Sequence, residues 1–507
     1  MGALDLDTQI AVIGAGAMGA GIAQVAAQAG HNVLLYDARP DAISQAIKNI
    51  DSQLGRRVAK GRLSAEQHSM TVARLQPAHS LSELADAGLI IEAIVEDLQV
   101  KRNLFRQLED CCSADCIFAS NTSSISITSL AAELRHPERM LGMHFFNPAP
   151  VMALVEIISG LASAWQLADR LYATALAWGK KPVHARSTPG FIVNRVARPF
   201  YAESLRLLEE GAADFATLDA LLRDAGGFRM GAFELTDLIG HDVNYAVTCS
   251  VFEAYYGDPR FQPSLIQKEL VDAGFLGRKS GRGFYRYDAA AVPEPVAALQ
   301  STADVRHCVV EGHLGVAQPL VQRLRDAGVE VSMRPGNGYL RVEDTVLALS
   351  DGRLATERAR AEGLENLVLF DLAHDYASTS RLGLSWSHKT SPEALDHAVA
   401  LLGKTAIAAT PLSDIPGLAV LRTLAMLANE AAEALLHGVA SAADIDLAMQ
   451  AGVNYPQGPL AWADRVGADY ILRTLENLQR VYGDVRYRPS LQIRRTVAKG
   501  GQLNEQH

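Results

Sequence analysis

The segment from Gln9 to Gly30 constrains the fold of this chain most strongly. An apolar run, Gln9 to Ile13, is followed at once by the turn G-A-G-A-M-G and by a helix of small residues. A second apolar run, His31 to Tyr36, ends at Asp37. This glycine spacing is weak evidence alone, but between a strand and a helix it is typical of a Rossmann unit that binds a dinucleotide. We therefore predict that the chain begins with a parallel α/β sheet.

Each glycine of this turn has its own task. Gly14 permits the tight turn, Gly16 lets the backbone approach a pyrophosphate, and Gly19 lets the helix lie close to the sheet. The N-terminus of the helix then faces the phosphates. We expect the cofactor to contact Gly14, Gly16, Ala17, Met18 and Gly19.

Asp37 lies about 20 residues further on, where a carboxylate accepts hydrogen bonds from the ribose hydroxyls of a dinucleotide. A carboxylate there would repel a 2′-phosphate, so NAD is favoured over NADP, with Arg39 close by as a possible phosphate partner. The alternative is that Asp37 caps the helix predicted from residue 41.

Two short apolar strands, Met140 to Phe146 and Leu154 to Ile158, are separated by a loop with two prolines. If they pair as a hairpin in which Phe146 faces Leu154, His144 faces Glu156, with Cβ atoms about 5 Å apart. In such a dyad the carboxylate fixes the tautomer of the imidazole and stabilises the imidazolium formed when the ring takes a proton. The alternative is a histidine of the core with a satisfied hydrogen bond.

Four motifs extend this pattern: S-N-T-S-S (Ser120 to Ser124), H-F-F-N-P-x-P from His144, L-V-E ending at Glu156, and T-P-G-F-I-V-N-R (Thr188 to Arg195). With this spacing, residues 8 to about 288 resemble the (S)-3-hydroxyacyl-CoA dehydrogenases. The resemblance implies oxidation of the C3 hydroxyl of an (S)-3-hydroxyacyl-CoA with NAD as hydride acceptor.

The resemblance also implies roles for individual residues. His144 would remove the hydroxyl proton with help from Glu156, while Ser123 and Asn194 would hydrogen-bond the C3 oxygen. Glu96, Lys101, Ser123 and Asn147 would lie at the nicotinamide end of the cofactor site. The substrate contacts implied are Lys60, Lys101, Ser123 and Asn194.

Helical patterns at 40 to 54 and 64 to 75 predict a hairpin whose tip carries four basic residues: Arg56, Arg57, Lys60 and Arg62. Ser64 and Gln67 form a capping box at the start of the second helix. The resemblance implies that this hairpin lies along the coenzyme A moiety. The alternative is an ordinary solvated face.

The second half of the chain repeats part of the first. Shifting the sequence by 227 positions places Pro189 on Pro416 and Asp237 on Asp464, so the helical region is duplicated. Leu421 stands at the register of Asn194, and the region before the repeat retains a strand-helix-strand pattern without a third glycine. We expect no dinucleotide in this second half.

These patterns predict four domains: an NAD-binding Rossmann domain (1–185), an all-α domain (186–288), a reduced Rossmann-like domain (299–410) and a second all-α copy (411–507). A linker rich in Ala, Val and Pro spans residues 289–298. Shorter relatives of this family pair two chains through their helical domains. The resemblance therefore implies an internal pseudo-dimer, and a homo-oligomer is possible.

The composition excludes several other classes of protein. A formal charge of −10 disfavours nucleic-acid and anionic-membrane partners. The number of cysteines, five, is odd, and three of them (Cys111, Cys112 and Cys116) crowd a helix end without a nearby histidine, which indicates reduced thiols and disfavours a zinc site. The sequence shows no signal peptide and no spanning segment, which predicts a cytoplasmic protein.

The acyl chain stays open. The long duplicated form resembles enzymes of bacterial fatty-acid and phenylacetate degradation, which implies 3-hydroxybutyryl-CoA or 3-hydroxyadipyl-CoA as substrate. Two other functions are weighed: a β-hydroxyacid dehydrogenase, which would use a lysine where this helix carries Asn194, and a non-enzymatic NAD-binding protein of the crystallin kind.

Overall fold

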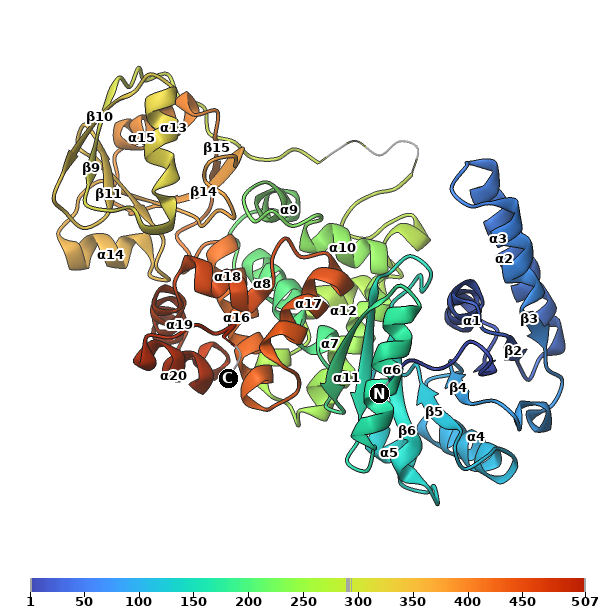
Figure 1. Cartoon of the computed structure of the whole chain (residues 1–507). Coiled ribbons are helices and arrows are strands. Elements are labelled where there is room, and N and C mark those ends of the chain that lie inside the picture. The colour runs from blue at the N-terminus through green and yellow to red at the C-terminus, as the bar shows by residue number, and fades with distance from the viewer. Residues whose placement is uncertain (1, 289–291, 293, 506–507) are drawn as a thin grey trace. The chain divides into compact units, whose positions relative to one another are not determined.

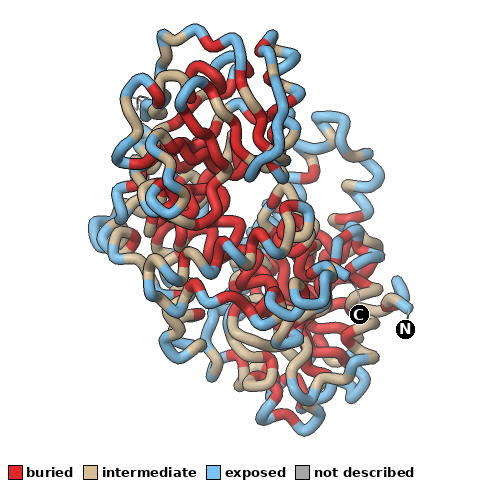
Figure 2. Tube along the Cα trace, turned by 90° about the vertical axis from the view of Figure 1, so that its left-hand side faces the viewer, coloured by how far each residue is buried: buried red, intermediate tan, exposed pale blue. Residues whose placement is uncertain are grey.

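The computed structural model describes residues 2–288, 292 and 294–505. The chain forms two compact units, one of residues 1–195 with 437–453 and one of residues 196–436 with 454–507. Figure 1 shows their elements, and Figure 2 shows the buried residues concentrated inside them. Residues 289–291 and 293 of the predicted linker lie outside the described residues.

An eight-stranded sheet forms the centre of the first unit, in the order β3-β2-β1-β4-β5-β6-β7-β8. The strands are β1 (Ile10–Ile13), β2 (Val33–Tyr36), β3 (Leu75–Pro77), β4 (Leu89–Glu92), β5 (Ile117–Ser120), β6 (Met140–Phe145), β7 (Leu154–Ser159) and β8 (Lys181–Arg186). All neighbours pair in parallel except β6 and β7, which are antiparallel. The Rossmann-like doubly wound sheet predicted from the sequence is therefore confirmed.

The helices of the first unit are α1 (Ala17–Ala29), α2 (Pro40–Ala59), α3 (Ala65–Ala73), α4 (Leu98–Cys111), α5 (Ile127–Ala131), α6 (Trp165–Ala177), α7 (Val193–Val196) and α17 (Ala442–Val453). The buried side of α1 is made of small residues that pack on the sheet. The first unit thus holds its core between a largely parallel sheet and the helices that cover it.

The predicted hairpin is formed by α2 and α3, and the capping box of Ser64 with Gln67 is present. Helix α2 continues to Ala59, five residues beyond the predicted end. Arg56 and Arg57 therefore lie in its last turn, where cations interact favourably with the helix dipole. The turn itself begins at Lys60.

The second unit contains most of the helical repeat. Its helices are α8 (Arg198–Glu209), α9 (Phe215–Asp224), α10 (Ala232–Ile239), α11 (His241–Ala254), α12 (Leu265–Asp272), α16 (Val420–Leu436), α18 (Pro459–Val466), α19 (Ala468–Tyr482) and α20 (Leu491–Lys499). A shift of 227 residues places α10 on α18 and α11 on α19, and α9 on α17 of the first unit. The predicted second copy of the all-α domain is confirmed.

Helices α8 and α16 pack against each other around a buried ion pair. The Nε atom of Arg422 lies 2.7 Å from Oε2 of Glu203, and its terminal nitrogens bond both carboxylate oxygens of Glu210. The side chains of Arg422 and Glu203 have no exposed area. Two tyrosine hydroxyls, of Tyr482 and Tyr487, accept from the same guanidinium group.

A seven-stranded sheet forms the reduced Rossmann-like region, in the order β10-β9-β11-β12-β13-β14-β15. Its strands are β9 (His307–Glu311), β10 (Glu330–Arg334), β11 (Tyr339–Val342), β12 (Thr345–Leu349), β13 (Leu367–Phe370), β14 (Arg381–Trp386) and β15 (Ala408–Pro411), with helices α13 (Pro319–Asp326), α14 (Ala355–Glu362) and α15 (Pro392–Lys404). The pairing is mixed: β11 is antiparallel to β9 and β12, and β13 to β14.

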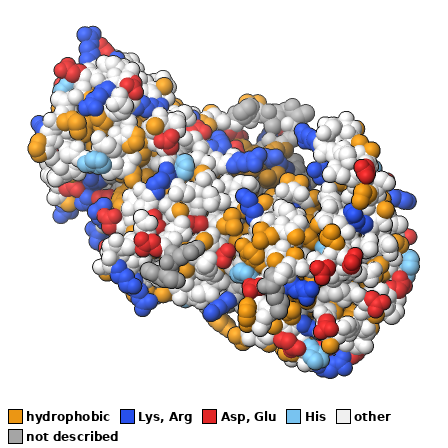
Figure 3. All heavy atoms as spheres, in the orientation of Figure 1, with side chains coloured by type: hydrophobic (Ala, Val, Ile, Leu, Met, Phe, Trp, Pro, Cys, Tyr) orange, Lys and Arg blue, Asp and Glu red, His pale blue; other side chains and the backbone are white. Residues whose placement is uncertain are grey.

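Charged side chains of both signs are interspersed on the face shown in Figure 3. Within residues 2–288, 292 and 294–505, no helix is both long and apolar enough to cross a membrane. The cytoplasmic location stays a prediction.

Candidate active site

The glycine-rich turn lies between β1 and α1, at the carboxyl edge of the parallel strands. Gly14 has a φ of +107°, and a Cβ atom on it would lie 2.4 Å from the carbonyl oxygen of Ala93. A Cβ atom on Gly19 would lie 1.8 Å from the carbonyl oxygen of Gly14, so both positions require glycine. A Cβ atom on Gly16 would instead enter open space, which leaves its backbone accessible to a pyrophosphate.

A pocket of about 610 Å³ lies along this turn and is lined by Gly14, Gly16 and Asp37. The carboxylate of Asp37 is held by two backbone N–H groups, those of Ala15 at 2.8 Å and Arg39 at 2.9 Å. Helix α2 begins at Pro40 with Arg39 at its N-cap, so Asp37 does not cap it and the helix-cap alternative is excluded. The pocket and its fixed carboxylate fit the adenosine end of NAD.

His144 and Glu156 face each other in the antiparallel pair of β6 and β7, in the predicted register. Nδ1 of His144 lies 2.6 Å from Oε2 of Glu156. The other carboxylate oxygen of Glu156 accepts from the N–H groups of Ile192 and Val193, both at 3.0 Å. Because Nδ1–H donates to the carboxylate, Nε2 of His144 carries the free lone pair of the imidazole.

The dyad is nearly sealed from solvent, since the side chain of His144 is 8% exposed and that of Glu156 is fully buried. The ring of His144 packs against Phe146 and Phe191, with centroid distances of 4.6 and 5.9 Å. A buried, hydrogen-bonded imidazole with one free nitrogen is the arrangement that a general base requires.

Asn194 comes directly after Ile192 and Val193, whose backbone N–H groups donate to Glu156. It lies in α7, and its side-chain amide makes no hydrogen bond within the described residues. The hydroxyl of Ser123 likewise has no partner there, and the loop that carries it is tied to β6 because the side chain of Asn121 accepts from the N–H of Phe145 at 2.8 Å. Both predicted substrate donors are therefore available.

Glu96 organises the S-N-T-S-S loop. Its carboxylate accepts from the hydroxyl of Thr122 at 2.6 Å and from the N–H groups of Ser123 and Ser124 at 3.0 and 3.2 Å. Burial alone would raise the pKa of Glu96, but the charge of Lys101 and these hydrogen bonds lower it below its usual value. Glu96 is therefore ionised at neutral pH and holds the backbone of Ser123 in place.

Lys101 is buried between two carboxylates. Its Nζ atom lies 2.6 Å from Oε1 of Glu92 and 3.2 Å from Oε2 of Glu96, and only 1% of its side chain is exposed. Its contact with substrate stays a prediction, because the ammonium group is already paired. Glu92, which also accepts from the hydroxyl of Ser120 at 2.6 Å, was missed by the sequence analysis.

Two other predicted contacts lie on the surface. Lys60 at the hairpin tip and Asn147 after β6 are both exposed. Neither the coenzyme A contact of Lys60 nor the cofactor contact of Asn147 is tested by these positions, and both stay predictions.

The second sheet has a different chemistry at the corresponding place. Asp371, directly after β13, faces Gly383 on β14, and its N–H donates to the carbonyl of Gly383 at 2.9 Å. Its carboxylate accepts from the N–H groups of Ala419, Val420 and Leu421 at the start of α16. By the shift of 227 positions Asp371 stands at the register of His144 and Gly383 at that of Glu156, so the second sheet lacks the His-Glu dyad at this place.

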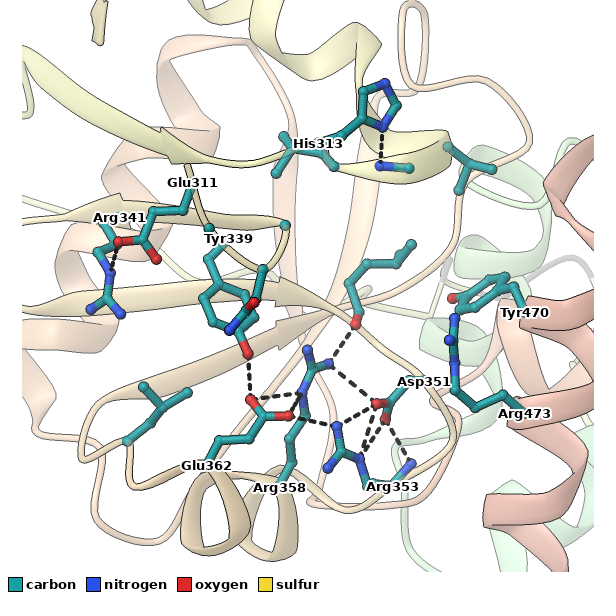
Figure 4. A pocket seen from close by; sticks show the side chains of 18 of the residues that line it. Glu311, His313, Tyr339, Arg341, Asp351, Arg353, Arg358, Glu362, Tyr470 and Arg473 are labelled. Carbon is teal, nitrogen blue, oxygen red and sulfur yellow. Dashed lines mark hydrogen bonds and ion pairs between the residues drawn. The ribbon is translucent and has the colours of Figure 1, made fainter. Parts of the chain in front are cut away.

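A pocket of about 900 Å³ lies at the carboxyl ends of β9, β10 and β12 in this second sheet. Figure 4 shows Arg353 and Arg358 converging on Asp351 and Glu362, which neutralise them. The amide of Gly315, where a phosphate would sit, already donates to the ring of His313. These contacts favour the absence of a second dinucleotide, which stays a prediction.

Three family models match the chain. The model described as 3-hydroxyacyl-CoA dehydrogenase, NAD binding domain, matches residues 9–188. The 3-hydroxyacyl-CoA dehydrogenase C-terminal domain matches twice, at residues 190–287 and 417–506. The 3-hydroxybutyryl-CoA dehydrogenase reduced Rossmann-fold domain matches residues 347–416.

Individual proteins match over the whole chain or its first half. The 3-hydroxyadipyl-CoA dehydrogenase of Escherichia coli (strain K12) is 46% identical over 97% of this chain and 98% of its own length. A probable 3-hydroxybutyryl-CoA dehydrogenase of Bacillus subtilis (strain 168) is 40% identical over 55% of this chain and 97% of its own length. The crystal structure of 3-hydroxybutyryl-CoA dehydrogenase from E. coli K12 superposes with a TM-score of 0.89 at 44% identity, covering 98% of this chain and 99% of that one.

Proposed function

Because the chain belongs to the 3-hydroxyacyl-CoA dehydrogenase family, we propose that it oxidises the C3 hydroxyl of an (S)-3-hydroxyacyl-CoA to a ketone with NAD. The observation that carries this proposal is the buried dyad, with 2.6 Å between Nδ1 of His144 and Oε2 of Glu156. A non-enzymatic NAD-binding protein would have no need of it.

The residues divide the work as follows. NAD supplies the hydride acceptor when bound, at a site that the glycine turn and Asp37 would hold. Nε2 of His144 accepts the hydroxyl proton, and Glu156 stabilises the resulting imidazolium. Ser123 and Asn194 donate to the C3 oxygen and orient it. A positioned base of this kind accelerates the reaction about 10²- to 10⁴-fold.

For the acyl group, we infer a short chain, either 3-hydroxybutyryl or 3-hydroxyadipyl. The support is the name of the E. coli relative that matches almost the full chain, and the name of the similar crystal structure. The exposed basic tip of the α2–α3 hairpin, with Lys60, is proposed to contact the phosphates of coenzyme A.

The test is to follow the formation of NADH after addition of (S)-3-hydroxybutyryl-CoA or (S)-3-hydroxyadipyl-CoA. We expect NADH with at least one of them. No reduction of NAD with any 3-hydroxyacyl-CoA would contradict the proposal. Turnover of a free 3-hydroxy acid in place of the thioester would support the β-hydroxyacid dehydrogenase instead.

A further inference from the structure

Helix α17 belongs to the second helical copy by its sequence but to the first compact unit by its contacts. Residues 437–453, the α17 segment, cluster with residues 1–195, and the helix packs against β7 and β8. The N–H of Arg186, at the end of the edge strand β8, donates to the carbonyl of Val439 at 2.8 Å. The second half of the chain therefore takes part in packing the sheet that carries the catalytic dyad.

Gly452, in the last turn of α17, lies where β7 and α7 come together. A Cβ atom on it would lie 2.6 Å from Cδ2 of Leu154 and 3.2 Å from Cγ2 of Val193. Leu154 begins β7, two residues before Glu156, and Val193 donates its N–H to Glu156. The glycine is thus in contact with both elements that hold the carboxylate of the dyad.

A second contact of the α17 segment reaches the residue that follows Asn194. Nη2 of the buried Arg195 lies 3.2 Å from Nδ1 of His437, at the start of the segment. Asn194 therefore stands between two residues that the segment contacts, Val193 on one side and Arg195 on the other. Because its amide is proposed to hold the C3 oxygen of the substrate, the segment contacts the neighbours of this donor as well as the surroundings of the dyad.

The first helical copy makes the equivalent contact in the second unit. By the shift of 227 positions, α9 and β14 correspond to α17 and β7, and α9 packs against β14. Nε of Arg381, the first residue of β14, donates to Oδ2 of Asp224 at the end of α9 at 2.9 Å. Ala225 stands at the register of Gly452. Each copy thus packs this helix on the sheet of the other, with a glycine at the catalytic sheet and an alanine at the second sheet.

We propose that the α17 segment is a positioning element of the active site, which fixes the separation of β7 from α7 and with it the placement of Glu156 and Asn194. The close approach requires glycine at position 452. At 2.6 Å in place of the 3.4 Å of ordinary contact, an added methyl carbon would be about 0.8 Å too close to Leu154, which is fully buried. The second half of the chain is then required for the chemistry of the first. This inference rests on the proposed function.

The test is Gly452→Ala in the full chain. The added methyl group should move β7 and α7 apart, and a misplacement of about 1 Å at an active site costs roughly 10²-fold in rate. We expect kcat for NADH formation to fall about 10- to 10²-fold, while the Kd of NAD stays unchanged. Adding Leu154→Val withdraws the obstructing methyl group and should recover most of kcat. An unchanged kcat in Gly452→Ala would overturn the inference.

Ala225→Val is the matched control. It adds bulk at the equivalent position of the first copy, against the second sheet, which lacks the dyad. Overpacking should lower Tm in both variants, but Ala225→Val should keep kcat within about twofold. An equal loss of kcat in the two variants would show that added bulk acts through overall stability, and would reject the positioning role.

A third variant is used if Gly452→Ala does not fold. Met449 lies one turn before Gly452 on the buried side of α17, so Met449→Ala loosens the helix without adding bulk. It should lower kcat several-fold and leave the Kd of NAD unchanged. An unchanged kcat in this variant counts against the inference.

A measurement without turnover separates this inference from the proposed function. The hydrogen bond between Nδ1 of His144 and Glu156 is short, at 2.6 Å, so its proton should resonate at low field and can be assigned by its loss in His144→Gln. Gly452→Ala should move this resonance upfield, and Ala225→Val should not. A shift without oxidation of any thioester supports the positioning role and rejects the proposed function alone. An unmoved resonance rejects the positioning role even if thioesters are oxidised.

Discussion

Replacing Glu156 by glutamine tests the dyad most sharply, because Glu156 serves two partners at once. One carboxylate oxygen accepts from the N–H groups of Ile192 and Val193, and the other accepts from Nδ1–H of His144. Glutamine has one oxygen and one NH₂ group, so it can accept hydrogen bonds either from the two backbone N–H groups or from His144, but not from both. If its oxygen stays with the two amides, its NH₂ group faces His144 and must donate to Nδ1.

The magnitude follows from what the other orientation would cost. Turning the glutamine oxygen toward His144 leaves two buried N–H donors without acceptors, at about 1–3 kcal/mol each. The orientation that keeps both backbone N–H groups bonded is therefore favoured by at least about 2 kcal/mol, and in it the proton of His144 sits on Nε2. The tautomer with Nε2 free to act as a base is then disfavoured by a factor of roughly 30. The imidazolium also loses its carboxylate. The same exchange behind the catalytic histidine of serine proteases lowers kcat about 10⁴-fold, and we expect 10³- to 10⁴-fold here.

The assay is kcat for NADH formation at neutral pH, with the Kd of NAD measured on the same sample and expected to be unchanged. Asp371→Asn provides the control, because Asp371 also holds backbone N–H groups at a helix start with a buried carboxylate but faces Gly383 and no imidazole. The control should keep kcat within about twofold. If Glu156→Gln retained more than a tenth of the original kcat, the tautomer argument would be refuted.

Three further predictions follow from other parts of the structure. Asp37, whose half-buried carboxylate is held by the N–H groups of Ala15 and Arg39, should make kcat/KM with NAD at least about 10²-fold higher than with NADP. Asp37→Asn should reduce this ratio, and equal kcat/KM with both cofactors in the unmodified protein would contradict the prediction. Arg422→Met should destabilise the second unit by roughly 2–3 kcal/mol, because the buried carboxylate of Glu203 loses one of its two cationic partners and keeps only Arg206, and the double change with Glu203→Met should recover part of this loss in denaturant unfolding. The pKa of Glu96 in the folded state lies below its ordinary value of 4.5, so the ionised carboxylate contributes its full stabilisation above pH 4.5 and loses it as the pH falls through the lowered pKa. The difference in Tm between the unmodified protein and Glu96→Gln should therefore shrink toward pH 3. A difference in Tm that stayed constant from pH 7 to 3 would contradict this prediction.

The sequence predicted those features that depend on local pattern and spacing. The register of β6 and β7 followed from two apolar strands and the loop between them, and it placed His144 opposite Glu156 as found. The requirement for glycine at positions 14 and 19 could be predicted from the motif, because in this turn a Cβ atom at either position would collide with a nearby backbone carbonyl. The duplicated helices followed from the repeat alone.

Contacts that depend on how separate elements pack could not be predicted in this way. Glu92 ends an apolar strand, and nothing near it in the sequence indicates that Lys101 reaches it from the first turn of α4. The extra turn of α2 was missed because basic residues are compatible with both a loop and a helix end.

The duplication of the helical domain within one chain has a genetic consequence. When two identical chains form an interface, every codon change appears on both sides of the symmetry axis and must be tolerated twice. Here Arg422 in α16 contacts Glu203 in α8 and Glu210 at the C-cap of α8, and each of these residues has its own codon. The second helical copy therefore has to preserve only its packing, while the first copy also has to preserve its chemistry. The buried Leu421, which stands at the register of Asn194, illustrates this difference.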